Sequence, residues 1–148
     1  MKKFVIYVVV VFTCAISAFF IYRGIQASHY ANTAVPYIHE VLPRISTWNP
    51  DLAVDYMAPE VLARVTPEQL ANLMRALSRI GELQSIGQPQ FKNKSTGGDV
   101  NSAQKPVVSY EVEAQYSTGE ATVLISLLDL GDSFKVYHFN FQTQALVQ

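Results

Sequence analysis

The sequence predicts an α+β protein with an N-terminal transmembrane helix, about three further helices and a curved four-stranded antiparallel sheet. Three observations predict it: an uncharged apolar run from Phe4 to Tyr22, apolar residues at helical spacing up to Gly81, and alternation of apolar and polar residues beyond it. Because the helices precede the strands along the chain, we expect separate layers, with the apolar stripes of the helices packed into one concave sheet face.

The first element, the helix over Phe4 to Tyr22, has the length of a membrane span. Its nineteen residues extend about 28 Å, close to the roughly 30 Å hydrocarbon core of a bilayer. Lys2 and Lys3 precede the run and only Arg23 follows it closely, so the positive-inside rule predicts a cytoplasmic N-terminus and a periplasmic or extracellular domain. We therefore divide the chain into a cytoplasmic tip and anchor, residues 1–26, and an extracytoplasmic α+β domain, residues 27–148.

A cleaved signal peptide is the alternative to a retained single-pass anchor. Signal peptides have apolar cores of about 7–15 residues, shorter than this run, although a weak small-residue cleavage site lies near Ile25 to Ala27. We favour the anchor on its length, and both readings export the domain. Cys14 is not interpreted as a lipid-attachment residue, because the apolar run continues past it.

Composition excludes several classes of function. Without Lys2, Lys3 and Arg23, eight basic residues remain against twelve acidic ones, so the exported part carries a charge of about −4 and lacks the basic stripe of a nucleic-acid binder. His29 and His39 are ten residues apart, and no His-Glu-x-x-His or Cys-x-x-Cys motif occurs. We expect no metal and no cofactor.

Capping signals predict where the helices of the exported part begin and end. Apolar residues follow helical spacing over residues 30–45, with two prolines that interrupt or start the helix. Asn49-Pro50-Asp51 is typical of a helix start, and a short turn is expected over Glu60 to Arg64. Thr66 and Gln69 have the spacing of a capping box, ahead of an apolar stripe that Gly81 ends.

The strands follow Gly81, where the apolar period changes from 3.6 to 2. We predict an irregular first strand, then a long loop, then a meander of three strands. The first strand is expected over Leu83 to Phe91, the loop over Lys92 to Lys105, and the meander strands over Val107 to Tyr116, Ala121 to Leu130 and Phe134 to Phe141.

The last two strands carry apolar residues on both faces, which predicts that something covers the second face. The candidates are a second copy of the chain, another protein or the chain's own terminus, although scattered apolar surface residues are also normal. We expect a partner-binding patch made of Leu124, Leu128, Tyr137, Phe139 and Phe141, serving a homodimer or a membrane-complex partner. On that expectation, Leu128→Lys or Phe139→Lys abolishes association and retains the fold.

The stretch WNPDLAVDYMAPEVLARVTPEQLANLMRALSRIGELQSIGQP, which leads into the strand meander, resembles small exported proteins of unknown function with a cystatin-like, nuclear-transport-factor-type fold. The resemblance covers roughly Tyr37 to Gln142. It implies a curved sheet wrapped around a helix, an internal cavity, frequent dimerisation through the outer sheet face, and functions that range from isomerase to scaffold. The single anchor is also similar to that of the inner-membrane assembly proteins of type IV secretion systems, which are longer than this chain.

An acid–base site is the alternative to a binding surface. His138 on the last strand, Asp129 near the end of the strand before it, and Tyr56 at the same mouth could act together, as an Asp and a Tyr do in isomerases of the resembled fold. The opposing interpretation is that His138 is a partly exposed strand residue and Asp129 a turn former. Because no nucleophile, base and orienting group can be identified together, we favour a non-enzymatic binding or assembly module over a small-molecule binder or isomerase-like enzyme.

Overall fold

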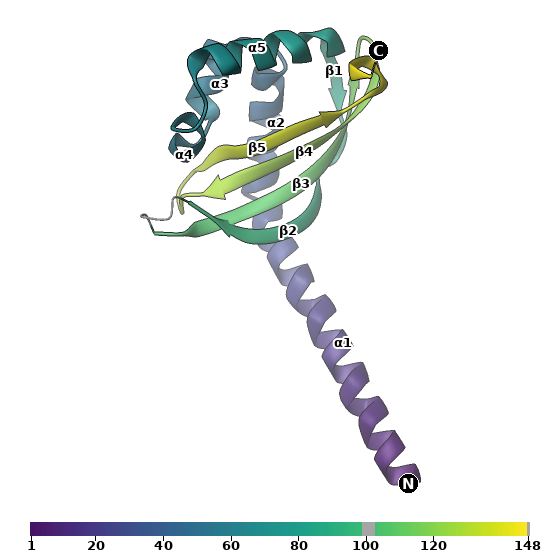
Figure 1. Cartoon of the computed structure of the whole chain (residues 1–148). Helices are drawn as coiled ribbons and strands as arrows, with labels where there is room; N and C mark the ends of the chain where they lie inside the picture. The colour runs from purple at the N-terminus through teal and green to yellow at the C-terminus, as the bar shows by residue number, and fades with distance from the viewer. Residues whose placement is uncertain (99–102, 148) are drawn as a thin grey trace. The chain divides into compact units, whose positions relative to one another are not determined.

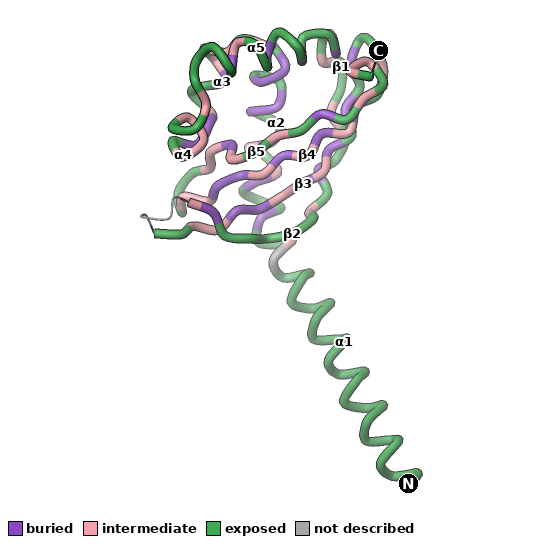
Figure 2. Tube along the Cα trace, in the orientation of Figure 1, coloured by how far each residue is buried: buried purple, intermediate pink, exposed green. Residues whose placement is uncertain are grey.

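The N-terminal part of the chain is a single apolar helix. The computed structural model describes residues 1–98 and 103–147, and it divides the chain into two compact units, residues 1–33 and residues 34–148. The first unit is the helix α1 (Lys2–Ala31), which is long and apolar enough to cross a membrane and has no buried residue in its most apolar 18-residue window (Figures 1 and 2). The predicted apolar helix is confirmed. The side on which the second unit lies and the boundary after residue 26 stay predictions.

The polar side chains inside α1 are satisfied by the helix itself. The Thr13 hydroxyl donates to the Val9 carbonyl oxygen at 2.8 Å, and the Ser17 hydroxyl donates to the Thr13 carbonyl oxygen at 2.9 Å. Such bonds to the preceding turn remove the need for water around a hydroxyl, and so make these residues compatible with a hydrocarbon environment.

The second unit is α+β, as predicted. Within residues 34–98 and 103–147, four α-helices precede five strands (Figure 1). The helices are α2 (Ala34–Ile45), α3 (Pro50–Tyr56), α4 (Pro59–Leu62) and α5 (Pro67–Leu77), and the 3-10 turn η1 (Ser78–Ile80) extends α5. The strands are β1 (Leu83–Ile86), β2 (Gln90–Gly97), β3 (Lys105–Tyr116), β4 (Gly119–Asp129) and β5 (Phe134–Gln142), followed by the 3-10 turn η2 (Gln144–Leu146).

The predicted helix caps are present. The Asn49 side chain accepts a hydrogen bond from the Asp51 amide at 3.0 Å at the start of α3. Thr66 and Gln69 form a reciprocal capping box at the start of α5, with bonds of 3.2 and 3.0 Å. Gly81 follows η1 with φ +90°, a conformation in which a side chain is strained. Local chemistry therefore sets these boundaries.

The sheet has five strands, whereas the sequence predicts four. Its order is β1-β3-β4-β5, and β2 also pairs with β3, beside β1. All of these pairings are antiparallel. The predicted first strand is interrupted at residues 87–89, and β2 continues to Gly97 through residues predicted to be loop. The rest of that predicted loop includes residues 99–102, which lie outside the described residues. β2 escapes prediction because it is an exposed edge strand with no apolar alternation.

The sheet has two distinct faces. The inner face carries the buried residues Val108, Tyr110, Val112, Ile125 and Leu127, and the outer face carries their alternating neighbours, such as Ser109 and Leu124. Helix α2 packs on the inner face with the stripe Ala34, Ile38, Val41, Leu42 and Ile45. Its C-terminal end is fixed there by a 2.8 Å hydrogen bond between the hydroxyls of Ser46 and Tyr116. The expected packing of a helical stripe on one sheet face is therefore present.

Candidate functional site

A hollow of about 320 Å³ lies where the chain passes from the inner to the outer face of the sheet. It is lined by Glu60, Val61, Arg64, Val65, Tyr137 and His138, and we call it the α4 hollow. Four of its six residues have ionisable side chains of different kinds, a carboxyl, a guanidinium, a phenol and an imidazole. Charge and apolar surface therefore meet in one small concave space, which is typical of a ligand site.

The path of the chain between α3 and α4 builds this hollow. Met57 forms a parallel bridge with Val136, and the Ala58 amide donates to the Val136 carbonyl oxygen at 2.8 Å. The two residues thus add to the free edge of β5. Because successive side chains of an extended segment point to opposite faces, Met57 lies with the inner face and Ala58 with the outer face. Pro59 then starts α4 on the outer side.

A small apolar cluster on the outer face forms the floor beneath α4. Its buried members are Ala58, Val107 and Leu128, and half-buried Val61, Leu130 and Tyr137 pack against it; we call it the outer cluster. Val107 and Leu128 are directly paired across β3 and β4, and Leu128 has no exposed surface. The chain itself therefore covers this end of the outer face.

Tyr137 reaches the outer cluster through an irregularity in β5. Ser126 pairs with His138 and Leu127 pairs with Val136, so Tyr137 is an extra residue without a partner in the ladder. Such a bulge re-aims a side chain. The Tyr137 ring passes so close to Gly97 that a β-carbon at Gly97 would lie 3.0 Å from it and 2.7 Å from the Val107 side chain. A glycine is therefore required at the end of β2 by this close approach.

The charged groups of the hollow are not paired with one another. The Oε2 atom of Glu60 is buried and has no hydrogen-bond partner among the residues that the structure describes. Arg64 lies four residues further on and is exposed, and within the described residues no ion pair joins it to Glu60. His138 is exposed on the neighbouring strand. Glu60 and Arg64 thus line one hollow without pairing with each other, and each is able to bind a group of opposite charge.

The predicted acid–base trio is not assembled. His138 pairs with Ser126 on the outer face, whereas Asp129 pairs with Phe134 and follows the inner-face alternation. Ser126, the partner of His138, and Asp129 are three positions apart on β4, roughly 10 Å along a strand. The Asp129 carboxylate accepts the Gly131 amide at 2.9 Å, as the turn-former interpretation predicts. Tyr56 lies on α3, so the three side chains do not converge on one reacting atom.

The five predicted partner-binding residues divide between the two faces, so the single patch expected from the sequence is wrong. Phe139 and Phe141 pair with Ile125 and Val123 on the inner face. There the ring centroid of Phe141 also lies 5.4 Å from that of Trp48. Leu128 and Tyr137 belong to the outer cluster under α4. Only Leu124 among the five is both half-exposed and on the uncovered part of the outer face. What covers the second apolar face is largely the chain itself.

Sequence reasoning missed Glu60 and Arg64. The signal was present but faint: an acidic and a basic residue four positions apart on one side of a short, proline-initiated turn. Nothing in the sequence places that turn on the outer face, since its position depends on the single bridge between Met57 and Val136.

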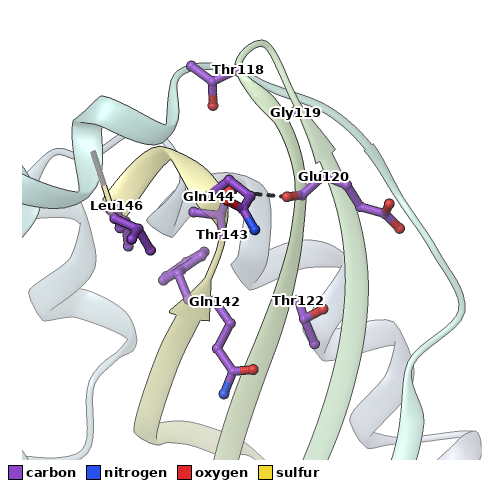
Figure 3. A pocket seen from close by; sticks show the side chains of 10 residues that line it. Thr118, Gly119, Glu120, Thr122, Gln142, Thr143, Gln144 and Leu146 are labelled. Atoms are coloured by element: carbon purple, nitrogen blue, oxygen red, sulfur yellow. Dashed lines mark hydrogen bonds between the residues drawn. The ribbon is translucent and has the colours of Figure 1, made fainter.

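A second, wider hollow of about 780 Å³ lies beside the C-terminal turn η2 (Figure 3). Its labelled side chains are mainly hydroxyls and amides, and the Thr143 hydroxyl donates to the Glu120 carbonyl oxygen at 3.1 Å, as the dashed line in Figure 3 marks. It holds one carboxylate and no cationic side chain. Within residues 1–98 and 103–147, no cluster of three or more His, Cys, Asp or Glu side chains could hold a metal ion.

Two phenols in the second unit have hydroxyls that are buried without a partner, those of Tyr37 and Tyr110. Burial raises the pKa of each to about 12, and Glu40 and Tyr56 add to the effect at Tyr37. Tyr110 is 2% exposed, and its ring packs on Phe91 with the ring centroids 5.7 Å apart. These hydroxyls lie among packed side chains and not at the α4 hollow.

Stability should therefore fall as the pH rises from 10 to 12. In the unfolded chain a phenol ionises near pH 10, whereas both folded phenols keep the proton to about pH 12, so the unfolded state binds fewer protons in this window. Urea unfolding followed by Trp48 fluorescence at pH 8 and pH 11.5 should show a smaller alkaline loss for Tyr110→Phe than for wild type. Equal losses would contradict the assignment.

No protein-family model, curated protein or solved structure matches this chain.

Proposed function

We propose that the protein is a membrane-tethered, non-enzymatic binding module, in which α1 crosses the membrane and the α+β unit binds a partner on the extracytoplasmic side. The observation that carries the proposal is the exposure of α1. An apolar stretch of this length with none of its central window buried is stable only in a nonpolar surrounding. The charges Lys2 and Lys3 before the run favour retention of the N-terminus in the cytosol.

The outer sheet face supports binding of a partner more than formation of an obligate homodimer. Beyond the outer cluster this face is polar, with Glu113, Gln115, Thr122 and Asn140 around half-exposed Leu124. Obligate interfaces are usually more apolar, whereas polar faces with an isolated apolar anchor suit complexes that form and dissociate. The second face of a cystatin-like cone would serve such a role, which agrees with the resemblance of the sequence to that group.

The alternative, an isomerase-like enzyme, finds less support. The groups proposed for acid–base chemistry lie on opposite faces of the sheet, and general acid–base catalysis requires them within hydrogen-bond reach of one substrate. A small-molecule ligand remains compatible with the α4 hollow, whose charged groups are assembled in one place.

Membrane placement is tested with full-length protein carrying an N-terminal tag and expressed in bacteria. We expect it in the membrane fraction after alkaline carbonate washing, with the domain degraded by protease added outside the inner membrane and the tag protected. Val10→Arg with Ile16→Arg should release the protein from the membrane, because each charge costs about 2.5–3.5 kcal/mol at the centre of a span. Ser17→Leu is the matched control and should not. Unprocessed wild-type protein in the cytosol would contradict the proposed membrane placement.

Partner binding is tested by photo-crosslinking in the same membranes. A crosslinking amino acid at position 124, on the outer face, should give a discrete adduct, whereas one at position 73, exposed on α5, should not. Adducts of equal yield from both positions would speak against the outer face as the interface.

A further inference from the structure

Glu60, which lines the α4 hollow, has a buried carboxylate oxygen that no group among the described residues satisfies. Leaving a buried acceptor without a donor costs about 1–3 kcal/mol, and more for a charged group. Arg64, four residues along the chain from Glu60 and two past the end of α4, has the charge to pair with it. Within the described residues they do not pair, and both line the same space. The arrangement leaves one acidic and one basic side chain available to a bound ligand.

The charges that such a ligand must carry follow from the charges of the residues that line the hollow. A simple anion would meet the Glu60 carboxylate, and a simple cation would meet the Arg64 guanidinium, so each is disfavoured by like charge. A molecule with both an ammonium and a carboxylate satisfies both residues. His138 also lines the hollow and adds a further polar group.

The remaining walls are apolar. Val61, Val65 and the Tyr137 ring, which is placed by the bulge in β5, also line the hollow. The volume of about 320 Å³ is at the lower end of the range of roughly 300–1,000 Å³ that small-molecule sites occupy. A short aliphatic side chain would remove this apolar surface from water.

We propose that the α4 hollow binds a small zwitterion, an amino acid or short peptide with an aliphatic side chain. The ammonium donates to the Glu60 carboxylate, the carboxylate of the ligand accepts from the Arg64 guanidinium, and the side chain packs on Val61, Val65 and Tyr137. This inference gives the ligand class for the proposed binding module and rests on that proposal.

The test uses full-length protein in detergent micelles, with affinity measured by isothermal titration at pH 7. The probes are leucine, leucinamide, which lacks the carboxylate, N-acetyl-leucine, which lacks the ammonium, and Leu-Leu, whose two charges lie further apart. We expect leucine or Leu-Leu to bind at least tenfold more tightly than either blocked compound. Preference for leucine assigns the ligand as a free amino acid, and preference for Leu-Leu assigns it as a peptide.

Two variants show which residue recognises which charge. Glu60→Gln should abolish the preference for leucine over N-acetyl-leucine and keep the preference over leucinamide, and Arg64→Gln should do the reverse. Loss of a merely structural contact would weaken all four probes together. Glu68→Gln and Arg79→Gln, exposed residues that do not line the hollow, are the matched controls and should bind as wild type.

Equal binding of all four probes, no binding of any, or unchanged selectivity in Glu60→Gln and Arg64→Gln overturns the inference. Those results leave the proposed function standing if position 124 still gives its adduct in membranes. A cytosolic protein that retains the charge-selective titration would have the opposite meaning, removing the membrane-tethered role and keeping the site.

Discussion

Leu128→Asp is expected to unfold the α+β unit, whereas Leu124→Asp is expected to leave it folded. Both leucines lie on the outer face of β4, four residues apart. Leu128 has no exposed surface and packs in the outer cluster, where an aspartate would be buried without a donor and too short to reach water. We expect a loss of at least about 4 kcal/mol, much of the 5–15 kcal/mol stability of a typical domain.

The comparison depends on the difference in burial between the two positions. Half-exposed Leu124 should lose no more than about 1 kcal/mol on the same change, since the new carboxylate stays hydrated. Leu128→Ala, which only removes packing, should cost about 2–5 kcal/mol. Urea unfolding of the full-length protein, followed by Trp48 fluorescence, measures all three. Similar losses at positions 124 and 128 would show that α4 does not cover the outer face.

Trp48→Ala is expected to be less stable than Trp48→Gly, the reverse of the usual order. Trp48 follows α2 with φ +59°, in the left-handed region where a side chain costs roughly 1–2 kcal/mol. Its indole N–H donates to the Gly81 carbonyl oxygen at 2.8 Å, and its ring packs on Tyr116 with the ring centroids 6.0 Å apart. These interactions hold the unfavourable backbone in place.

Removal of the indole should cost about 3 kcal/mol or more in both variants. Glycine recovers about 1 kcal/mol of it, because it adopts positive φ freely, whereas alanine keeps the strain. Trp48→Phe, which retains a ring and loses the donor to Gly81, should lie between wild type and Trp48→Gly. Since Trp48 is the only tryptophan, pulse proteolysis in urea replaces fluorescence as the measurement. An alanine variant as stable as the glycine variant would contradict a strained position 48.

The parts of the fold that were predictable depend on neighbouring residues. Asn49 and Thr66 cap their helices with groups two or three positions away, and β3 alternates because its own side chains divide between core and solvent. The apolar N-terminal helix was equally predictable, because its length and its absence of charge suffice to recognise it. Such features require no knowledge of the tertiary structure.

The parts that were missed depend on distant residues. β2 is polar and becomes a strand because β3 offers it a partner, so no period in its own sequence indicates it. The apolar residues of β4 and β5 were correctly recognised as two-sided, but the cover was assigned to a partner. A bridge between Met57 and Val136, 79 positions apart, decides that α4 supplies it. The same bridge assembles Glu60 and Arg64 with His138.

The strand-like addition of Met57 and Ala58 to β5 has a consequence for crowding. On the proposed membrane tethering, copies would diffuse in two dimensions and collide far more often than in solution, and an unprotected sheet edge would then recruit its neighbours into fibres. Here one edge is partly occupied from within the chain, and the opposite edge carries Lys92 and Lys94 among polar residues. Polymerisation by strand addition is thereby disfavoured, so that copies held close together would stay separate molecules.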